Sequence, residues 1–255
     1  MKRLTVMGLT VILTVMLLSS AAAVKFKGAD SLTLKGTLKK PKGDGPFPAV
    51  VLLHGCAGVN YERDSMWVSR LKRWGYITLQ VDSLGSRGDA DICIDNDLMK
   101  KYVSKRAMDA HDAKSYLAGL RFVDPKRIAV MGWSHGAISV IASVSEMPGK
   151  EIVPFQAAIA FYPYCYKTLD DLNAPLLILI GGSDDWCPAK LCSSNMPKEG
   201  KSKHEVILKV YPGVCHGFDW PGKSVSYMGH TLRYNYKAGS DAIVQVREFL
   251  EKHLK

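Results

Sequence analysis

Ser134 has the residue type and the surroundings that a catalytic nucleophile needs. It is the central residue of Gly132–Gly136 (GWSHG), which has the G-x-S-x-G spacing of a nucleophile elbow. An elbow turns sharply from a strand into a helix and leaves the serine hydroxyl exposed, and glycines on either side avoid clashes in this tight turn. The apolar run 127–132 precedes the serine and a helix-compatible stretch, 137–147, follows it. We therefore interpret Ser134 as a nucleophile; the alternative is a serine that stands between two glycines by chance.

A serine nucleophile needs a base that takes its proton. The sequence has seven histidines, and His216 differs from the others in its position. It follows the apolar run 205–211 and lies in a loop between Gly213 and Gly217. A histidine in a loop just past a late strand can reach a central elbow, so His216 is the candidate base.

The base in turn needs an acid that orients its imidazole. Asp184 and Asp185 directly follow the apolar run 175–181. We take Asp184 as the acid, which leaves Asp185 to cap the helix that follows; Asp185 is the alternative acid. The order Ser134, Asp184, His216 is the chain order of the catalytic triad in α/β hydrolases.

An acyl-transfer site also needs two N–H donors for the oxyanion of the tetrahedral intermediate. The first expected donor is the backbone N–H of His135, directly after the nucleophile. The second should come from the loop after an early strand, here 52–58 (LLHGCAG), with Cys56 as the preferred donor and Ala57 as the alternative. His54, in the same loop, is a rival base by residue type, and we interpret it instead as a residue that shapes the loop.

These candidates have to be positioned by a sheet, and the sequence contains strands for one. Continuous apolar runs are typical of strands buried on both faces, and segments with helical spacing, 98–120 and 242–254, lie among them. Strands that alternate with helices predict an α/β fold with a mostly parallel central sheet and helices on both faces. Functional groups of such sheets collect at the carboxyl ends of the strands. The apolar runs are Ala49–Gly55, Tyr76–Asp82, Arg127–Gly132, Ala157–Tyr162, Pro175–Gly181 and Glu205–Tyr211.

The first 23 residues have the layout of a secretory signal peptide. Lys2 and Arg3 precede an apolar stretch, 4–18, and small residues follow up to Ala23, near which we expect cleavage. The apolar stretch is shorter than the roughly 20 residues that a membrane span needs. We therefore expect a secreted or periplasmic protein with a single domain, 24–255, and no stable membrane insertion after cleavage. An uncleaved N-terminal anchor is the alternative.

The charge of the chain does not favour nucleic acid as a partner. The formal net charge is +10, and cleavage would lower it because Lys2 and Arg3 leave with the signal peptide. The other lysines are scattered and have no aromatic platform between them, which is typical of a solvated surface. A small-molecule substrate is therefore expected, with a weak preference for anionic substrates.

The six cysteines of an exported chain indicate disulfides, although six cysteines allow fifteen pairings. They do not indicate a metal site, because Cys187 and Cys192 lack the CxxC spacing of zinc ligands. The acidic run 89–97 lacks the glycine and the terminal glutamate of a calcium loop. We therefore expect neither a metal nor an organic cofactor.

Together these motifs resemble the dienelactone hydrolase family within the α/β-hydrolase fold. The resemblance covers nearly the whole chain after residue 23. In this family the acid follows a glycine by three residues and a proline comes four residues later, and Gly181, Asp184 and Pro188 match that pattern. His216 falls on the family's histidine. The matching segments are FPAVVLLHGCAG, VDSLGSRG, MGWSHG, AFYPYC, IGGSDDWCP and YPGVCHGFD.

The chain departs from the family at its elbow. Founding members of the family carry cysteine there, whereas position 134 is serine. A serine depends on its base to become nucleophilic, so the resemblance implies a general carboxylic-ester hydrolase rather than an enzyme for dienelactones. The alternatives are a peptidase or acyl transferase on the same fold, and a secreted binding protein on a hydrolase scaffold without activity.

A few residues are candidates for contact with the substrate. Arg87, in SLGSRG, is a candidate for binding a substrate carboxylate through two guanidinium donors, and a structural ion pair is its alternative role. The aromatic residues that could line the substrate cleft are Trp133, Trp186, Trp220, Tyr162 and Phe218. Their alternative is a place in the core.

The cysteines can be sorted once this fold is assumed. Cys187 lies just past the acid and Cys215 just before the histidine, and their two loops must meet if the acid is to hold the histidine. A Cys187–Cys215 bridge is therefore predicted, with free buried thiols as the alternative. The remaining pairs would be Cys56–Cys93 and Cys165–Cys192.

Overall fold

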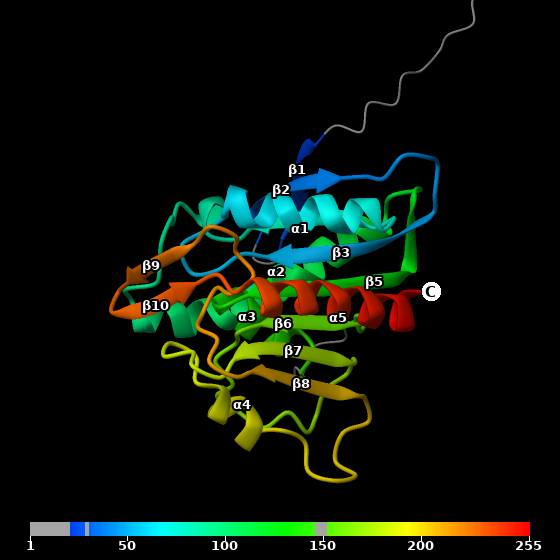
Figure 1. The fold of residues 1–255 in the computed structure, drawn as a ribbon. Helices are drawn as coiled ribbons and strands as arrows, with labels where there is room; N and C mark the ends of the chain where they lie inside the picture. The colour runs from blue at the N-terminus through cyan, green and yellow to red at the C-terminus, as the bar shows by residue number, and fades with distance from the viewer. Residues whose placement is uncertain (1–20, 29–30, 146–151) are drawn as a thin grey trace, which may run out of the picture.

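The computed structural model describes residues 21–28, 31–145 and 152–255. Their central feature is an eight-stranded sheet with the order β1-β2-β4-β3-β5-β6-β7-β8 (Figure 1). Strand β2 is antiparallel to both neighbours, and β4, β3, β5, β6, β7 and β8 are mutually parallel. The strands are β1 (Ala22–Lys27), β2 (Thr33–Lys39), β3 (Phe47–Leu53), β4 (Ile77–Asp82), β5 (Val123–Trp133), β6 (Ala158–Phe161), β7 (Leu176–Gly181) and β8 (Val206–Tyr211).

Helices cover the sheet on both faces, so the predicted α/β architecture is confirmed. Figure 1 shows α1 and α5 on one face of the sheet and α2 and α3 on the other. A separate hairpin of two short strands, β9 and β10, follows β8 in the chain. The bounds are α1 (Tyr61–Arg73), a 3-10 turn (Gly85–Arg87), α2 (Asn96–Ala118), α3 (His135–Ser143), α4 (Ala189–Ser194), β9 (Ser224–Tyr227), β10 (His230–Arg233) and α5 (Tyr236–Leu254).

The six predicted apolar runs all form strands of the sheet, and the central ones are buried along their length. Every residue of β6 and β7 is buried, as is the second half of β5. Because β3, β5, β7 and β8 are parallel, their carboxyl ends lie at one edge of the sheet. The loops after these strands therefore bring together residues that lie up to 160 positions apart in the chain, such as Cys56 and His216.

The two long predicted helices form, but both begin earlier than the apolar periodicity indicates. The side chain of Asp95 accepts hydrogen bonds from Asp97 N and Leu98 N, which caps α2 ahead of its first apolar residue. The side chain of Asn235 caps α5 in the same way. Polar caps thus extend both helices. Helix α3 ends at Ser143 and is shorter than the predicted stretch, whose last two residues, 146–147, lie outside the described residues.

The apolar runs and the helical spacing did not indicate β1, β2, α1 or the two strands of the hairpin. Strands β1 and β2 form one edge of the sheet, and many of their side chains are exposed, so they lack a long apolar run. Helix α1 begins after the capping side chain of Asn60 and buries Trp67, Val68 and Leu71 against the sheet. Its many charged residues obscure this apolar face in the sequence.

The predicted signal peptide lies mostly in residues 1–20, outside the described residues. Its expected end near Ala23 falls within β1, where Ala22 and Ala23 pair with Leu38 and Thr37. In the parts of the chain that the structure describes, no helix combines the length and the apolar character needed to cross a membrane.

Two of the three predicted disulfides are present. Cys56 is bonded to Cys93, and Cys165 is bonded to Cys192. The predicted Cys187–Cys215 bridge is wrong, because both thiols are free. Cys187 is buried, whereas Cys215 is partly exposed beside the buried His216. The two loops do meet, but they do so through other side chains.

Candidate active site

The turn around Ser134 has the geometry of a strained elbow. Ser134 connects β5 to α3 with φ 53° and ψ −119°, in a region of positive φ that non-glycine residues rarely adopt. A Cβ atom on Gly132 would lie 2.6 Å from the backbone of Gly136, and one on Gly136 would lie 2.2 Å from the backbone oxygen of Leu53. Both glycines are therefore required by close backbone packing, and this packing holds Ser134 in its conformation.

Asp184 and His216 form a buried pair. The Nδ1 of His216 lies 2.8 Å from Oδ2 of Asp184, and their side chains are 3% and 0% exposed. The other carboxylate oxygen, Oδ1, accepts hydrogen bonds from Trp186 N at 3.0 Å and Cys187 N at 2.7 Å. Both oxygens of Asp184 are thus satisfied, and its carboxylate fixes the tautomer of His216 with the proton on Nδ1. The Nε2 of the imidazole is left as the acceptor.

The neighbouring Asp185 has a different role from the one we expected. Its carboxylate accepts from Thr231 N at 3.2 Å and lies 3.5 Å from Nδ1 of His230, both in β10. It does not cap α4, whose N-cap is Pro188 without a side-chain hydrogen bond. Asp185 instead attaches the hairpin to the loop that carries Asp184.

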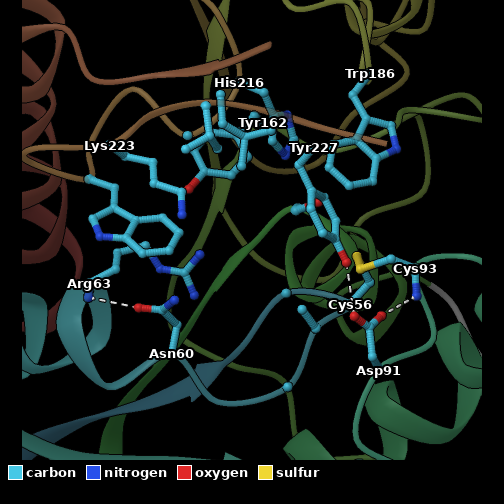
Figure 2. A pocket seen from close by; sticks show the side chains of 18 residues that line it. Cys56, Asn60, Arg63, Asp91, Cys93, Tyr162, Trp186, His216, Lys223 and Tyr227 are labelled. Carbon is cyan, nitrogen blue, oxygen red and sulfur yellow. Dashed lines mark hydrogen bonds between the residues drawn. A yellow bond between two sulfur atoms is a disulfide. The ribbon is translucent and has the colours of Figure 1, made fainter. Parts of the chain in front are cut away.

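Ser134 and His216 line the same cavity, which has a volume of about 330 Å³. Figure 2 shows this pocket with Arg63, Asn60 and Lys223 on one side, and with Trp186 and Tyr227 on the other. The pocket is lined by Gly55, Cys56, Ala57, Gly58, Asn60, Arg63, Asp91, Cys93, Ser134, Tyr162, Trp186, His216, Gly217, Trp220, Lys223, Val225, Tyr227 and Leu232.

The two candidate oxyanion donors come from segments that flank this pocket. His135 is the first residue of α3, and the first N–H groups of a helix have no partner within it. Cys56 and its alternative, Ala57, both line the pocket. The Cys56–Cys93 disulfide fixes the second segment, and Ile92 N donates to Cys56 O at 3.0 Å. A covalent bond and a hydrogen bond therefore restrain the loop that would supply the second donor.

A buried arginine contacts the two segments that carry His135 and Cys56. Arg106, in α2, is fully buried, and its Nη1 lies 2.6 Å from Nδ1 of His135. The Nε2 of His135 lies 2.8 Å from Met99 O. The guanidinium can only donate, so Nδ1 of His135 accepts and its Nε2–H donates to the carbonyl. Burial and the charge of Arg106 lower the pKa of His135 to about 3, so its imidazole is neutral.

Arg106 also contacts the other segment, since its Nη2 donates to the backbone oxygen of His54. His54 is buried, and its Nδ1 lies 2.7 Å from Gly55 O, to which it donates. Burial and the nearby Arg106 lower the pKa of His54 well below its usual value. These contacts support the interpretation of His54 as a residue that shapes the loop.

The proposed contacts of Arg87 and Trp133 with substrate are not supported. Nη1 and Nη2 of Arg87 donate to the buried carboxylate of Asp109 at 2.8 Å, and Nη1 also donates to Ser83 O. Trp133 is fully buried and donates from Nε1 to Asp219 at 2.9 Å. Arg87 therefore forms a structural ion pair and Trp133 lies in the core, as their alternative interpretations state. In both cases a buried carboxylate accepts the hydrogen bonds of the side chain.

The contacts of Asp219 and Tyr162 at the site were not predicted from the sequence. Asp219 lies three residues after His216 and also accepts from Trp67 Nε1 at 2.7 Å and from the Tyr162 hydroxyl at 2.8 Å. The ring centroids of Tyr162 and His216 lie 4.4 Å apart. The conformation of Tyr162, with φ 43°, gives no signal in the sequence. For Asp219 the sequence did contain a local signal, because the segment YPGVCHGFD, which carries His216, ends at this residue.

The hairpin forms one wall of the pocket. Trp186 stacks on His230 with ring centroids 4.8 Å apart and an interplanar angle of 9°, and it lies 5.8 Å from the ring of Tyr227. The Tyr227 hydroxyl donates to Asp91 at 2.9 Å, as the dashed line in Figure 2 shows. Trp186 also lines the pocket, and the hairpin connects the His216 loop with the segment that carries Cys93.

Comparisons with known proteins identify the family and the fold of the chain. The sequence model of the dienelactone hydrolase family matches residues 34–254. An uncharacterized protein of Mycobacterium tuberculosis is 29% identical over 206 residues, and the match covers 73% of this chain and 69% of that protein. The esterase FrsA of Escherichia coli is 28% identical over 123 residues, with 47% of this chain and 27% of that protein covered.

Solved structures share the fold across most of the chain. Dienelactone hydrolase from Anabaena variabilis superposes with a TM-score of 0.67 at 19% identity and covers 92% of this chain and 99% of its own. A dienelactone hydrolase-like promiscuous phosphotriesterase from metagenomic libraries gives a TM-score of 0.70 at 18% identity, with 92% and 100% covered. The fold is that of the α/β hydrolases.

Proposed function

Because the chain belongs to the dienelactone hydrolase family, we propose that it is a serine hydrolase that cleaves carboxylic esters through an acyl-enzyme. The observation that carries this proposal is the buried hydrogen bond of 2.8 Å between Asp184 and His216, in a molecule where His216 and the strained Ser134 line one pocket. The family membership supports a hydrolase, and the serine, the base and the acid support this particular chemistry.

In the proposed reaction, His216 Nε2 takes the hydroxyl proton as Ser134 Oγ attacks the ester carbonyl. Asp184 holds the imidazole by Nδ1 and stabilises the imidazolium that forms. Collapse of the tetrahedral intermediate breaks the bond to the alcohol, which receives the proton from Nε2. Water then attacks the acyl-enzyme by the same route, with His216 as base, and releases the acid and the free serine.

The negative charge that develops on the carbonyl oxygen needs fixed donors. We assign this role to the backbone N–H groups of His135 and Cys56. Their support by Arg106 and by the Cys56–Cys93 disulfide favours this assignment, because donors held in place beforehand need no reorganisation during the reaction. The proposed mechanism uses no metal or organic cofactor.

We further propose that the protein acts outside the cytoplasm on a small-molecule ester. The two disulfides support this location, since disulfides persist in oxidising compartments. A cavity of about 330 Å³ fits a small substrate. The similarity to an esterase supports an ester as the substrate class.

The test is hydrolysis of a series of p-nitrophenyl esters of increasing acyl length by the purified protein and by Ser134→Ala. Loss of a triad nucleophile typically lowers kcat by about 10⁶-fold, and we expect a loss on that scale with an unchanged circular dichroism spectrum. A fluorophosphonate should label the wild type at Ser134. Activity that survives in Ser134→Ala would refute the proposed nucleophile.

The same assay separates the alternatives. A triad does not fix the leaving group, so aminoacyl anilides should be tested beside the aryl esters. Faster cleavage of the anilides would identify a peptidase. A folded protein that hydrolyses neither class and is not labelled by the fluorophosphonate would be a binding protein on a hydrolase scaffold.

A further inference from the structure

Three donor groups of the kinds that bind transition metals meet beside the pocket. They are a carboxylate oxygen of Asp184, the sulfur of Cys187 and a ring nitrogen of His216, and no two of these atoms lie more than 4.8 Å apart. The three residues are 5%, 4% and 3% exposed. Cys187 is a free thiol, so its sulfur can act as a ligand. The cluster is thus largely buried and combines three kinds of ligand, and His216 also lines the pocket.

We propose that Asp184, Cys187 and His216 form a binding site for a zinc ion, and that occupation of this site switches off the hydrolase. Carboxylate, thiolate and imidazole are the three side-chain ligands that Zn²⁺ uses, and three protein ligands with a fourth solvent position make a complete tetrahedral site. Hard cations such as Mg²⁺ and Ca²⁺ prefer oxygen ligands only, so the sulfur and the nitrogen select against them.

The geometry needs only a small adjustment to accept the ion. Metal–ligand bonds of about 2.0 to 2.3 Å place the donors of a tetrahedral zinc site roughly 3.3 to 3.8 Å apart. Asp184 Oδ2 and His216 Nδ1 lie 2.8 Å apart and would have to separate by about 0.5 Å, whereas a donor at the 4.8 Å limit would move about 1 Å closer. A side-chain rotation of Cys187 can supply this movement without displacing β7 or β8.

The charges of the occupied site cancel. Metal binding deprotonates a cysteine ligand, and here the proton would come from the free thiol of Cys187. Metal binding releases that proton to solvent and leaves one thiolate and one carboxylate beside the dication. The neutral imidazole adds no charge. A buried site without net charge avoids the large cost of burying an uncompensated ion.

Zinc binding would block the proposed reaction at its first step. An ion at Nδ1 of His216 requires the lone pair of that nitrogen, so the imidazole proton moves from Nδ1 to Nε2. A protonated Nε2 cannot accept the proton of Ser134. The ion also takes the Asp184 carboxylate away from the imidazole. This inhibitory effect rests on the proposed function, whereas binding of the ion does not.

Binding is tested directly in the Ser134→Ala variant, which has no activity to follow. Calorimetric titration with Zn²⁺ should show one site per chain, and Co²⁺ should give a sulfur-to-cobalt charge-transfer band. Adding Cys187→Ser should abolish both signals, and Cys187→Ala serves as a second variant in case a buried hydroxyl impairs folding. Cys215→Ser is the matched control, since it removes the other free cysteine beside the same histidine and should keep both signals.

Inhibition is tested with the active protein on a p-nitrophenyl ester, each variant compared with its own metal-free rate. Loss of even an outer contact of a metal site typically costs 10- to 100-fold in affinity, so Cys187→Ser should raise the half-inhibitory Zn²⁺ concentration by at least about tenfold. Cys215→Ser should leave it unchanged.

The two proposals can fail separately. Equal zinc binding with and without the Cys187 sulfur, or no cobalt band at millimolar Co²⁺, would overturn the metal site while ester hydrolysis stood. A zinc site that needs Cys187, in a protein that hydrolyses no ester, would overturn the proposed function and keep the metal site.

Discussion

Nη1 of Arg106 lies 2.6 Å from Nδ1 of His135, the residue that directly follows the candidate nucleophile. The same guanidinium donates to the backbone oxygen of His54, two residues before Cys56. One fully buried cation in α2 therefore binds both segments that would supply the oxyanion donors. Burial lowers the pKa of Arg106 to about 10, and the group remains charged at neutral pH. Helix α2 thus fixes the distance between the two candidate donors.

Replacement of Arg106 by Met should lower kcat and leave KM nearly unchanged, because the donors bind mainly the oxyanion of the transition state. Loss of one oxyanion donor typically costs about 10²- to 10³-fold in kcat, and we expect a drop within that range. Arg106→Lys keeps the charge and should recover part of the rate. Steady-state kinetics on one aryl ester would check this. A raised KM with an unchanged kcat would contradict a positioning role for Arg106.

Replacement of Asp184 by Asn should lower kcat by about 10⁴-fold, the effect of losing the carboxylate of a serine triad. The amide keeps the shape of the side chain but leaves the His216 imidazole without a charged partner. Asp185→Asn is the matched control, because Asp185 is exposed and its carboxylate contacts Thr231 and His230 of β10. Its kcat should stay within a few-fold of wild type. Similar losses in the two variants would refute the assignment of Asp184 as the triad acid.

Replacement of Gly136 by Ala should destabilise the protein. The added Cβ would lie 2.2 Å from the backbone oxygen of Leu53, so the elbow or β3 has to shift. Overpacking of this kind typically costs about 1–3 kcal/mol, and the free energy of unfolding in urea would measure it. Gly119→Ala is the control, because its Cβ would meet nothing closer than 3.5 Å and its φ of −80° suits alanine. A Gly136→Ala protein as stable as Gly119→Ala would contradict the packing argument.

The stability of the protein should fall in mild acid because of His135. Its pKa is about 3 in the folded protein and 6.5 in the unfolded chain, so between these values the unfolded chain binds a proton that the folded protein does not. The contribution of His135 to the free energy of unfolding is complete above pH 6.5 and is lost as the pH falls toward 3. One such group changes the free energy of unfolding by at most about 1.4 kcal/mol per pH unit.

Urea unfolding at several pH values, for wild type beside His135→Gln, would check this pH dependence. The variant lacks the titrating imidazole and should lose stability less steeply between pH 6 and about 4. His54 and His111 also have lowered pKa values, so some slope should remain in the variant. Identical slopes would mean that His135 is not kept neutral by its surroundings.

The sequence by itself determined the fold and the identity of the main candidates. Apolar runs fix which segments become buried strands, because only such runs can be buried on both faces of a sheet. Local signals mark the candidates: the G-x-S-x-G segment, and the positions of Asp184 and His216 directly after strands. Because these strands are parallel, the candidates lie at the same edge of the sheet. Two of the predicted disulfides, Cys56–Cys93 and Cys165–Cys192, are present for the same reason: their segments meet in this fold.

Only the tertiary structure decided the partners of individual side chains. Arg87 binds Asp109 and Trp133 binds Asp219, while Cys187 lies beside Asp184 and His216 without reaching Cys215. Each of these outcomes depends on distances of a few ångströms between segments that are remote in the chain. Hydrophobic periodicity determines which face of an element is buried, but the direction of one side chain and the presence of a buried partner depend on how the elements pack.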